Sequence, residues 1–158
     1  MTRTNYFTPD VQDFLTLLSR HNVKYLIIGG EAVIYYGYAR VTGDIDIYYE
    51  MKEANCRLLF KALLDFWDND IPGISDIKDL MQEGEIIQFG IPPNRIDLLN
   101  SVDGIKFEEA WENRKEEVLE LKNGNIKINY IGIVELIKNK KASGRHKDKD
   151  DLRYLSKI

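Results

Sequence analysis

The segment spanning residues 26–49 constrains the fold more than any other part of the chain. It begins with an apolar, β-branched run that ends at Gly29 and Gly30, which is typical of a buried strand leading into a turn. A short helix is expected over about residues 31–38, and the alternating sequence Asp-Ile-Asp-Ile-Tyr-Tyr after Gly43 predicts another strand. A strand, a short helix and a second strand in succession indicate a mixed α+β fold.

The rest of the chain alternates between amphipathic helices and short strands. Strands are expected at about residues 85–90, 95–100, 117–122 and 125–131. An Asn-Gly pair between the last two is a strong hairpin signal. Helices are expected at about residues 8–22, 53–67, 76–81, 107–112, 133–141 and 147–156. Because no repeat or linker interrupts this pattern, the sequence predicts a single domain over residues 1–158.

Composition excludes several classes of protein. A length of 158 residues with 44% hydrophobic residues suits one domain with a sizeable core. The net charge of −4 argues against a protein that coats nucleic acid by bulk charge, although it permits a local basic patch. Cys56 is the only cysteine, which excludes an intramolecular disulfide and a multi-cysteine metal site. No secretory signal and no membrane-spanning stretch are evident, so we expect a soluble cytoplasmic protein.

Two aspartates stand out in the second strand of the segment 26–49. Asp44 and Asp46 are two positions apart, so both side chains point to the same face of the sheet. Two neighbouring carboxylates repel each other, and a hard divalent cation such as Mg²⁺ relieves this repulsion. The alternative is an edge strand with one polar face.

The glycine pair gives the aspartates a chemical context. Gly29 and Gly30 lie between a strand and a short helix, where free backbone N–H groups can hold a phosphate. A tight turn without a ligand is the alternative explanation. A phosphate cradle beside a pair of metal ligands is what binding of a nucleoside triphosphate requires.

The spacing of these features resembles that of a known superfamily. An apolar residue, Gly29-Gly30, thirteen residues and then Asp44-Ile45-Asp46-Ile47 resemble the signature of the DNA polymerase beta-like nucleotidyltransferases. The stretch is similar, more narrowly, to small bacterial minimal nucleotidyltransferases, some of them associated with toxin–antitoxin systems. The resemblance extends over about residues 24–155. It implies an α+β fold with a mixed sheet of about five strands flanked by helices.

The resemblance also implies a third carboxylate from a neighbouring strand. Asp97, within the predicted strand Arg-Ile-Asp-Leu-Leu, is the matching residue. Asp44, Asp46 and Asp97 together would bind two Mg²⁺ ions and form the catalytic centre. The alternative is that Asp97 forms an ion pair with Arg95 or Arg40.

Several cations are candidates for contacts with the triphosphate. Arg40 precedes the aspartates in a predicted loop, where it would bind a phosphate or anchor the loop to a carboxylate. The segment over about residues 132–158 is basic and helical, and the resemblance places it near the nucleotide. Lys141, Arg145 and Lys147 would then steer or neutralise the triphosphate. A solvated helix face is the alternative for these residues.

These features predict a metal-dependent nucleotidyltransferase. It would move a nucleoside monophosphate from an NTP, ATP among the candidates, to a hydroxyl of an RNA such as tRNA, a protein or a small molecule. The alternative is a non-catalytic binding or regulatory protein with the same fold, for example a partner in a toxin–antitoxin pair. A metal-dependent hydrolase is a third hypothesis, which the glycine cradle and the lack of histidine ligands disfavour. The sequence leaves the base and the acceptor open.

Overall fold

A computed structural model describes residues 2–4 and 6–158 of the chain, with side chains from residue 6 onward. The strands are β1 (Thr2–Thr4), β2 (Tyr25–Ile28), β3 (Asp44–Tyr49), β4 (Ile86–Phe89), β5 (Arg95–Leu99), β6 (Lys115–Leu121) and β7 (Gly124–Tyr130). The helices are α1 (Pro9–Arg20), α2 (Gly29–Tyr35), α3 (Glu53–Phe66), the 3₁₀ helix η1 (Ile77–Leu80), α4 (Phe107–Glu112), α5 (Ile133–Ser143) and α6 (His146–Leu155). The α+β class predicted from the sequence is confirmed.

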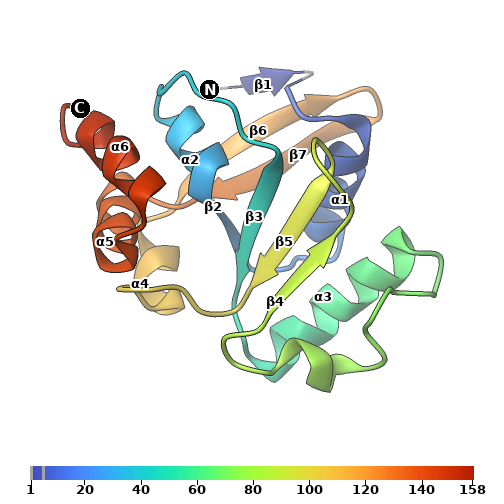
Figure 1. Ribbon diagram of the computed structural model, residues 1–158. Coiled ribbons are helices and arrows are strands. Elements are labelled where there is room, and N and C mark those ends of the chain that lie inside the picture. The colour runs from blue at the N-terminus through green and yellow to red at the C-terminus, as the bar shows by residue number, and fades with distance from the viewer. Residues whose placement is uncertain (1, 5) are drawn as a thin grey trace.

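All strands lie in one mixed sheet with the order β1-β6-β7-β2-β3-β5-β4 (Figure 1). Strand β3 pairs antiparallel with β2 and parallel with β5, while β6 and β7 form the predicted antiparallel hairpin. The sheet has seven strands, whereas the resemblance implied about five and the sequence pattern predicted six. β1, which pairs parallel with β6, was missed because its three residues carry no apolar pattern. The edge-strand alternative for β3 is wrong, since β3 lies between β2 and β5.

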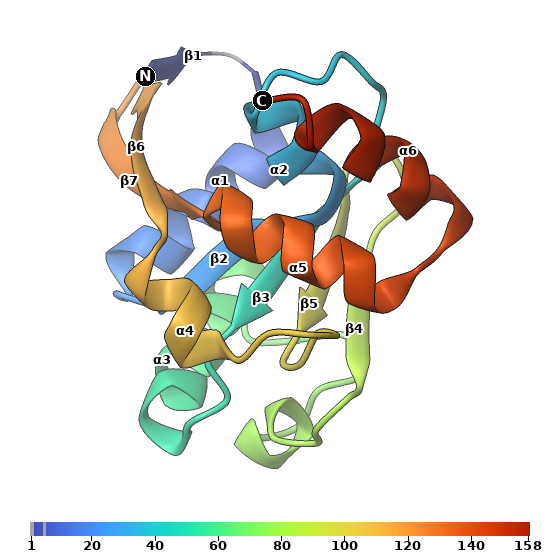
Figure 2. The same ribbon diagram turned by 90° about the vertical axis from the view of Figure 1, so that its left-hand side faces the viewer.

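Helices cover both faces of the sheet and enclose two apolar clusters. Helices α1 and α3 lie against one face, where Phe14 and Leu63 pack with Ile45 and Ile47. Helices α2, α4, α5 and α6 cover the other face (Figure 2), and the second cluster there includes Tyr48 of β3. None of the helices in the described part of the chain has the length and apolar character needed to cross a membrane.

The alternation along β3 and β5 separates core residues from polar ones. Ile45 and Ile47 point into the cluster under α1 and α3. Asp44, Asp46 and, on β5, Asp97 therefore point to the face that α2 and α6 cover. The carboxylates lie on the same face as the second apolar cluster, toward the starts of β3 and β5.

Candidate active site

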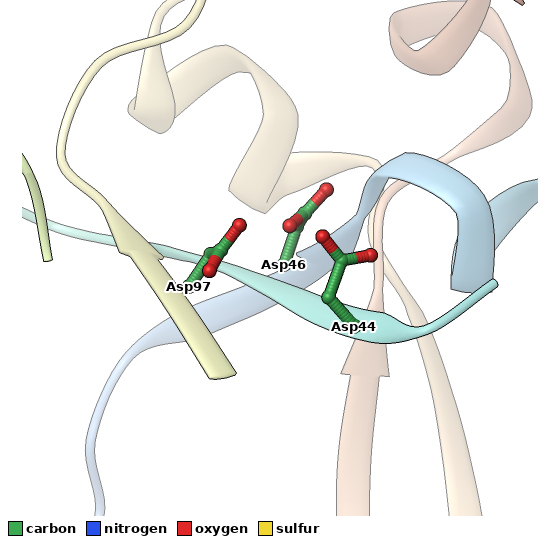
Figure 3. A group of neighbouring side chains, drawn as sticks. All are labelled: Asp44, Asp46 and Asp97. Carbon is green, nitrogen blue, oxygen red and sulfur yellow. The ribbon is translucent and has the colours of Figure 1, made fainter. Parts of the chain in front are cut away.

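Three carboxylates converge between β3 and β5. Because these strands are parallel and pair Asp46 with Asp97, both side chains stand next to each other on one face. Asp44, two residues before Asp46, completes the group, and Figure 3 shows all three carboxylates pointing the same way. One oxygen from each residue lies within 4.8 Å of the others. This set of hard oxygen donors fits a divalent cation such as Mg²⁺.

Burial and the neighbouring carboxylates make Asp46 costly to ionise. Burial, together with the charges of Asp44 and Asp97, raises the pKa of Asp46 to about 7, and the ammonium of Lys147 opposes this rise. At neutral pH the group therefore holds a proton on Asp46 part of the time. A bound cation would remove the need for that proton.

Arg95 is the direct counter-ion of the group. Its Nε donates a hydrogen bond to Asp97 Oδ1 at 3.0 Å, and its Nη2 donates one to Oδ2 at 2.9 Å. The same Nη2 lies 3.5 Å from Asp44 Oδ2. Of the two arginines considered as partners of Asp97, the structure thus selects Arg95. Asp97 pairs with Arg95 and also belongs to the carboxylate group. Its roles as an ion-pair partner and as a candidate metal ligand therefore do not exclude each other.

The glycine pair makes room for the aspartates. Gly29 begins α2 with a φ of +63°, and a Cβ there would overlap the carboxylate of Asp46. At Gly30, a Cβ would lie 2.9 Å from Thr42 Oγ1. Glycine at position 29 is therefore required both by the left-handed backbone and by the proximity of a site carboxylate.

Thr42 orients the first aspartate. Its hydroxyl donates a hydrogen bond to Asp44 Oδ1 at 3.0 Å, which helps to fix the carboxylate toward the other two. The same hydroxyl lies 3.3 Å from the backbone carbonyl oxygen of Asp44. Thr42 is not among the residues that the sequence predicted for the site. Its position two residues before Asp44 was the available signal, because that spacing permits a local side-chain contact.

Arg40 lies near the glycine pair but is anchored elsewhere. Its Nη1 donates to both carboxylate oxygens of Asp151 in α6, at 2.9 and 3.1 Å. The same nitrogen would be 3.6 Å from a Cβ at Gly30. The anchoring alternative for Arg40 is therefore observed, and its role in phosphate binding stays a prediction.

The three predicted cations of the tail occupy different environments. Lys147, in the first turn of α6, is close enough to affect Asp46 electrostatically. Arg145 caps α6 and donates to Asp148 at 3.0 Å through its Nε. Lys141 is exposed near the end of α5. Of these cations, Lys147 is the one that the structure relates to the carboxylate group.

The residue before Lys141 forms a buried ionic network that sequence reasoning missed. Lys140 Nζ lies 3.0 Å from Asp148 Oδ1 and 3.0 Å from Asp151 Oδ2, and all three side chains are buried. Arg40 and Arg145 complete this network. Nothing in the basic run distinguishes Lys140 from its neighbours, because its burial depends on how α5 packs against α6.

A hollow of about 310 Å³ adjoins the carboxylate group. It opens between the residues preceding α1, helix α2 and the loop that carries Arg40, and Asp44 lies in its wall. Apolar side chains and polar groups both line it, among them Phe7, Ile34 and Glu31. A larger groove of about 870 Å³ lies away from the aspartates, between α1, the end of α3 and the β6–β7 hairpin.

The family assignment agrees with this geometry. No curated protein matches the chain significantly. Residues 9–156, which include every helix and every strand except β1, match the family described as "Nucleotidyltransferase of unknown function (DUF6036)". The three aspartates and both glycines of the site fall within this range. The chain belongs to this family of nucleotidyltransferases.

Proposed function

We propose that the protein transfers a nucleoside monophosphate from an NTP to a hydroxyl group and releases pyrophosphate. One observation carries the proposal: the carboxylates of Asp44, Asp46 and Asp97 converge beside the Gly29-Gly30 turn, in a chain of a nucleotidyltransferase family. Phosphoryl-transfer sites work by positioning and charge neutralisation, and this cluster offers both.

The donor set indicates which residues would hold metal ions. Asp44 and Asp46 would bind two Mg²⁺ ions, and Asp97 would contribute to the one nearer the acceptor. When bound, such ions neutralise the triphosphate and make the acceptor hydroxyl easier to deprotonate. Thr42 would keep Asp44 in its binding orientation through the 3.0 Å hydrogen bond.

The remaining residues would bind and orient the nucleotide. Backbone groups at Gly29 and Gly30 would hold the β- and γ-phosphates, with Lys147 and Arg40 supplying positive charge. The acceptor oxygen then forms a bond to the α-phosphorus, and the bond between that phosphorus and the oxygen bridging to the β-phosphate breaks. The hydroxyl proton passes to Asp97 or to water, and pyrophosphate leaves. Asp97 would thus act as a ligand and a base.

Labelled nucleotides test the proposal. Each NTP, labelled with ³²P at either the α- or the γ-phosphate, is incubated with the protein, Mg²⁺ and a cell extract, and RNA, proteins and small molecules are then separated. Label is expected to be transferred from the α position, to require Mg²⁺ and to be lost in Asp46→Asn. Asp103→Asn, which removes an exposed loop carboxylate, is the matched control and should retain transfer.

Three results would contradict the proposal. Transfer of the γ-label would indicate a kinase, and transfer that survives in Asp46→Asn would remove the carboxylate group from the reaction. Binding of Mg²⁺ and NTP by calorimetry without any transfer would favour the alternative of a non-catalytic binding protein.

A further inference from the structure

Arg95 contacts two of the three carboxylates that would bind a metal ion. It donates to both oxygens of Asp97, and its Nη2 also lies 3.5 Å from Asp44 Oδ2. A divalent ion bound to these two aspartates would stand only a few ångström from the guanidinium. Two neighbouring cations repel strongly in a partly buried site, so metal and Arg95 cannot both hold this position at low cost.

The position of Arg95 allows its side chain to move. It is the first residue of β5, it pairs in register with Asp44, and its side chain is 35% exposed. Its guanidinium can therefore turn toward solvent without disturbing the buried part of the strand. A planar guanidinium binds a carboxylate or a phosphate through the same pair of parallel hydrogen bonds, so a phosphate can replace Asp97 as its partner.

We propose that Arg95 is an internal counter-ion that competes with the divalent metal for Asp97 and Asp44 and binds the triphosphate after the metal displaces it. The inference rests on the proposed function, because it assumes that these aspartates bind metal. It assigns Arg95 two effects of opposite sign. Arg95 weakens metal binding in the absence of nucleotide and strengthens nucleotide binding in the presence of metal.

These opposite effects distinguish the proposal from a merely structural role. An arginine that only holds Asp97 in place would, when removed, weaken metal binding and nucleotide binding together. Removal of a competing arginine would instead strengthen metal binding and weaken nucleotide binding. Metal and nucleotide binding are therefore expected to be cooperative in the wild-type protein and much less so without Arg95.

Mn²⁺ serves as the probe, with free ion followed by electron paramagnetic resonance. Titrations without nucleotide compare the wild type with Arg95→Met and with Arg57→Met, which removes an exposed arginine from α3 and serves as the matched control. Arg95→Met is expected to bind Mn²⁺ at least about tenfold more tightly than the wild type, because a charged hydrogen-bonding competitor has been removed. Arg57→Met is expected to match the wild type.

The second titration uses an α,β-methylene NTP at saturating Mn²⁺. Here Arg95→Met is expected to bind the analogue about tenfold or more weakly than the wild type, because it lacks the phosphate contact. Arg95→Lys keeps the charge but cannot form paired hydrogen bonds. Its affinities for Mn²⁺ and for the analogue are expected to lie between those of the wild type and of Arg95→Met. This conservative variant also provides the comparison if Arg95→Met does not fold.

The outcomes separate this inference from the proposed function. If the wild type binds Mn²⁺ and removal of Arg95 leaves its affinity unchanged or lower, the competition is refuted while the metal site stands. If analogue binding is unchanged in Arg95→Met, the phosphate contact is refuted. If neither protein binds Mn²⁺, the metal site fails and the inference fails with it.

Discussion

Replacement of Lys140 by methionine tests the buried network that joins α5 to α6. The ammonium of Lys140 lies 3.0 Å from oxygens of both Asp148 and Asp151, and its side chain is only 3% exposed. Methionine retains most of the apolar stem but removes the charge. Two buried carboxylates then lose the cation that they share.

The structure sets the size of the expected effect. Removal of one partner from a buried ion pair typically costs about 3–5 kcal/mol. Each carboxylate keeps another cation, since Arg145 donates to Asp148 at 3.0 Å and Arg40 to Asp151 at 2.9 Å. We therefore expect a loss near the lower limit, about 3 kcal/mol in the free energy of unfolding at pH 7.

The effect should depend on pH in a defined direction. Burial alone raises the pKa of Asp148, but hydrogen bonds from Ser143, Arg145 and Lys140 outweigh it and hold the pKa well below its usual value. A lowered carboxylate pKa stabilises the fold fully above the unfolded-state value of about 4, and this stabilisation shrinks gradually as the pH falls from there toward the folded-state pKa. The difference between the wild type and Lys140→Met should therefore be large at pH 7 and smaller at pH 3.

Urea denaturation followed by circular dichroism measures both expectations. Lys138→Met is the matched control on the same helix, because Lys138 pairs with Glu109 at 2.6 Å while its side chain is 53% exposed. An exposed pair of this kind contributes less than about 1 kcal/mol. The reasoning is refuted if Lys140→Met costs no more than Lys138→Met at pH 7, or if its cost is equally large at pH 3.

Two further changes probe the carboxylate group itself. With EDTA present, Asp46→Asn is expected to leave the melting temperature unchanged at pH 4 and to raise it progressively up to pH 7. The reason is that the folded protein holds a proton on Asp46 up to a pKa of about 7, whereas the unfolded chain loses this proton near pH 4. Equal stabilisation at pH 4 and at pH 7 would contradict the raised pKa of Asp46. Gly29→Ala is expected to lower the free energy of unfolding, measured by urea denaturation, by about 1–2 kcal/mol because of backbone strain. It is also expected to bind Mn²⁺ more weakly, because its Cβ overlaps Asp46. Gly73→Ala, with a φ of +73° and open space around it, should show the strain without the loss of metal binding.

Local patterns predicted the part of the site that one strand determines. The period of two along β3 placed Asp44 and Asp46 on one face, because side-chain direction in a strand depends only on position parity. Asp97 was identified by resemblance, and its proximity follows from the parallel pairing of β3 and β5. Helix boundaries were close to those expected, although α2 begins at Gly29 itself and the helix expected at 76–81 is a short 3₁₀ turn.

The features that the sequence did not predict are contacts between distant residues. Arg40 pairs with Asp151, which follows it by 111 positions, and no local rule selects that carboxylate among the acidic residues of α6. Lys140 is buried because the chain reverses at Gly144, which has a φ of +61°, and brings α6 against α5. Such pairings depend on how elements pack, and helical periodicity alone leaves them undetermined.

Asp148 and Asp151 form one group of acidic residues, and the three aspartates of the candidate site form another. The two groups differ in how their negative charge is balanced. Asp148 and Asp151 share three cations, Lys140, Arg145 and Arg40, and hydrogen bonds from its partners lower the pKa of Asp148.

The carboxylates of the candidate site have fewer ion-pair partners. In the part of the chain with described side chains, Asp44, Asp46 and Asp97 have Arg95 as their one ion-pair partner, and the pKa of Asp46 is raised to about 7. Burial alone raises the pKa of both Asp46 and Asp148, but the hydrogen bonds from Ser143, Arg145 and Lys140 outweigh it for Asp148, so the two pKa values shift in opposite directions. An excess of negative charge in a partly buried cluster is costly if the cluster has only a structural role. It is the arrangement expected where the missing positive charge is supplied by bound metal ions. Asp44, Asp46 and Asp97 therefore fit the proposed metal site, whereas Asp148 and Asp151 fit a structural ion-pair network.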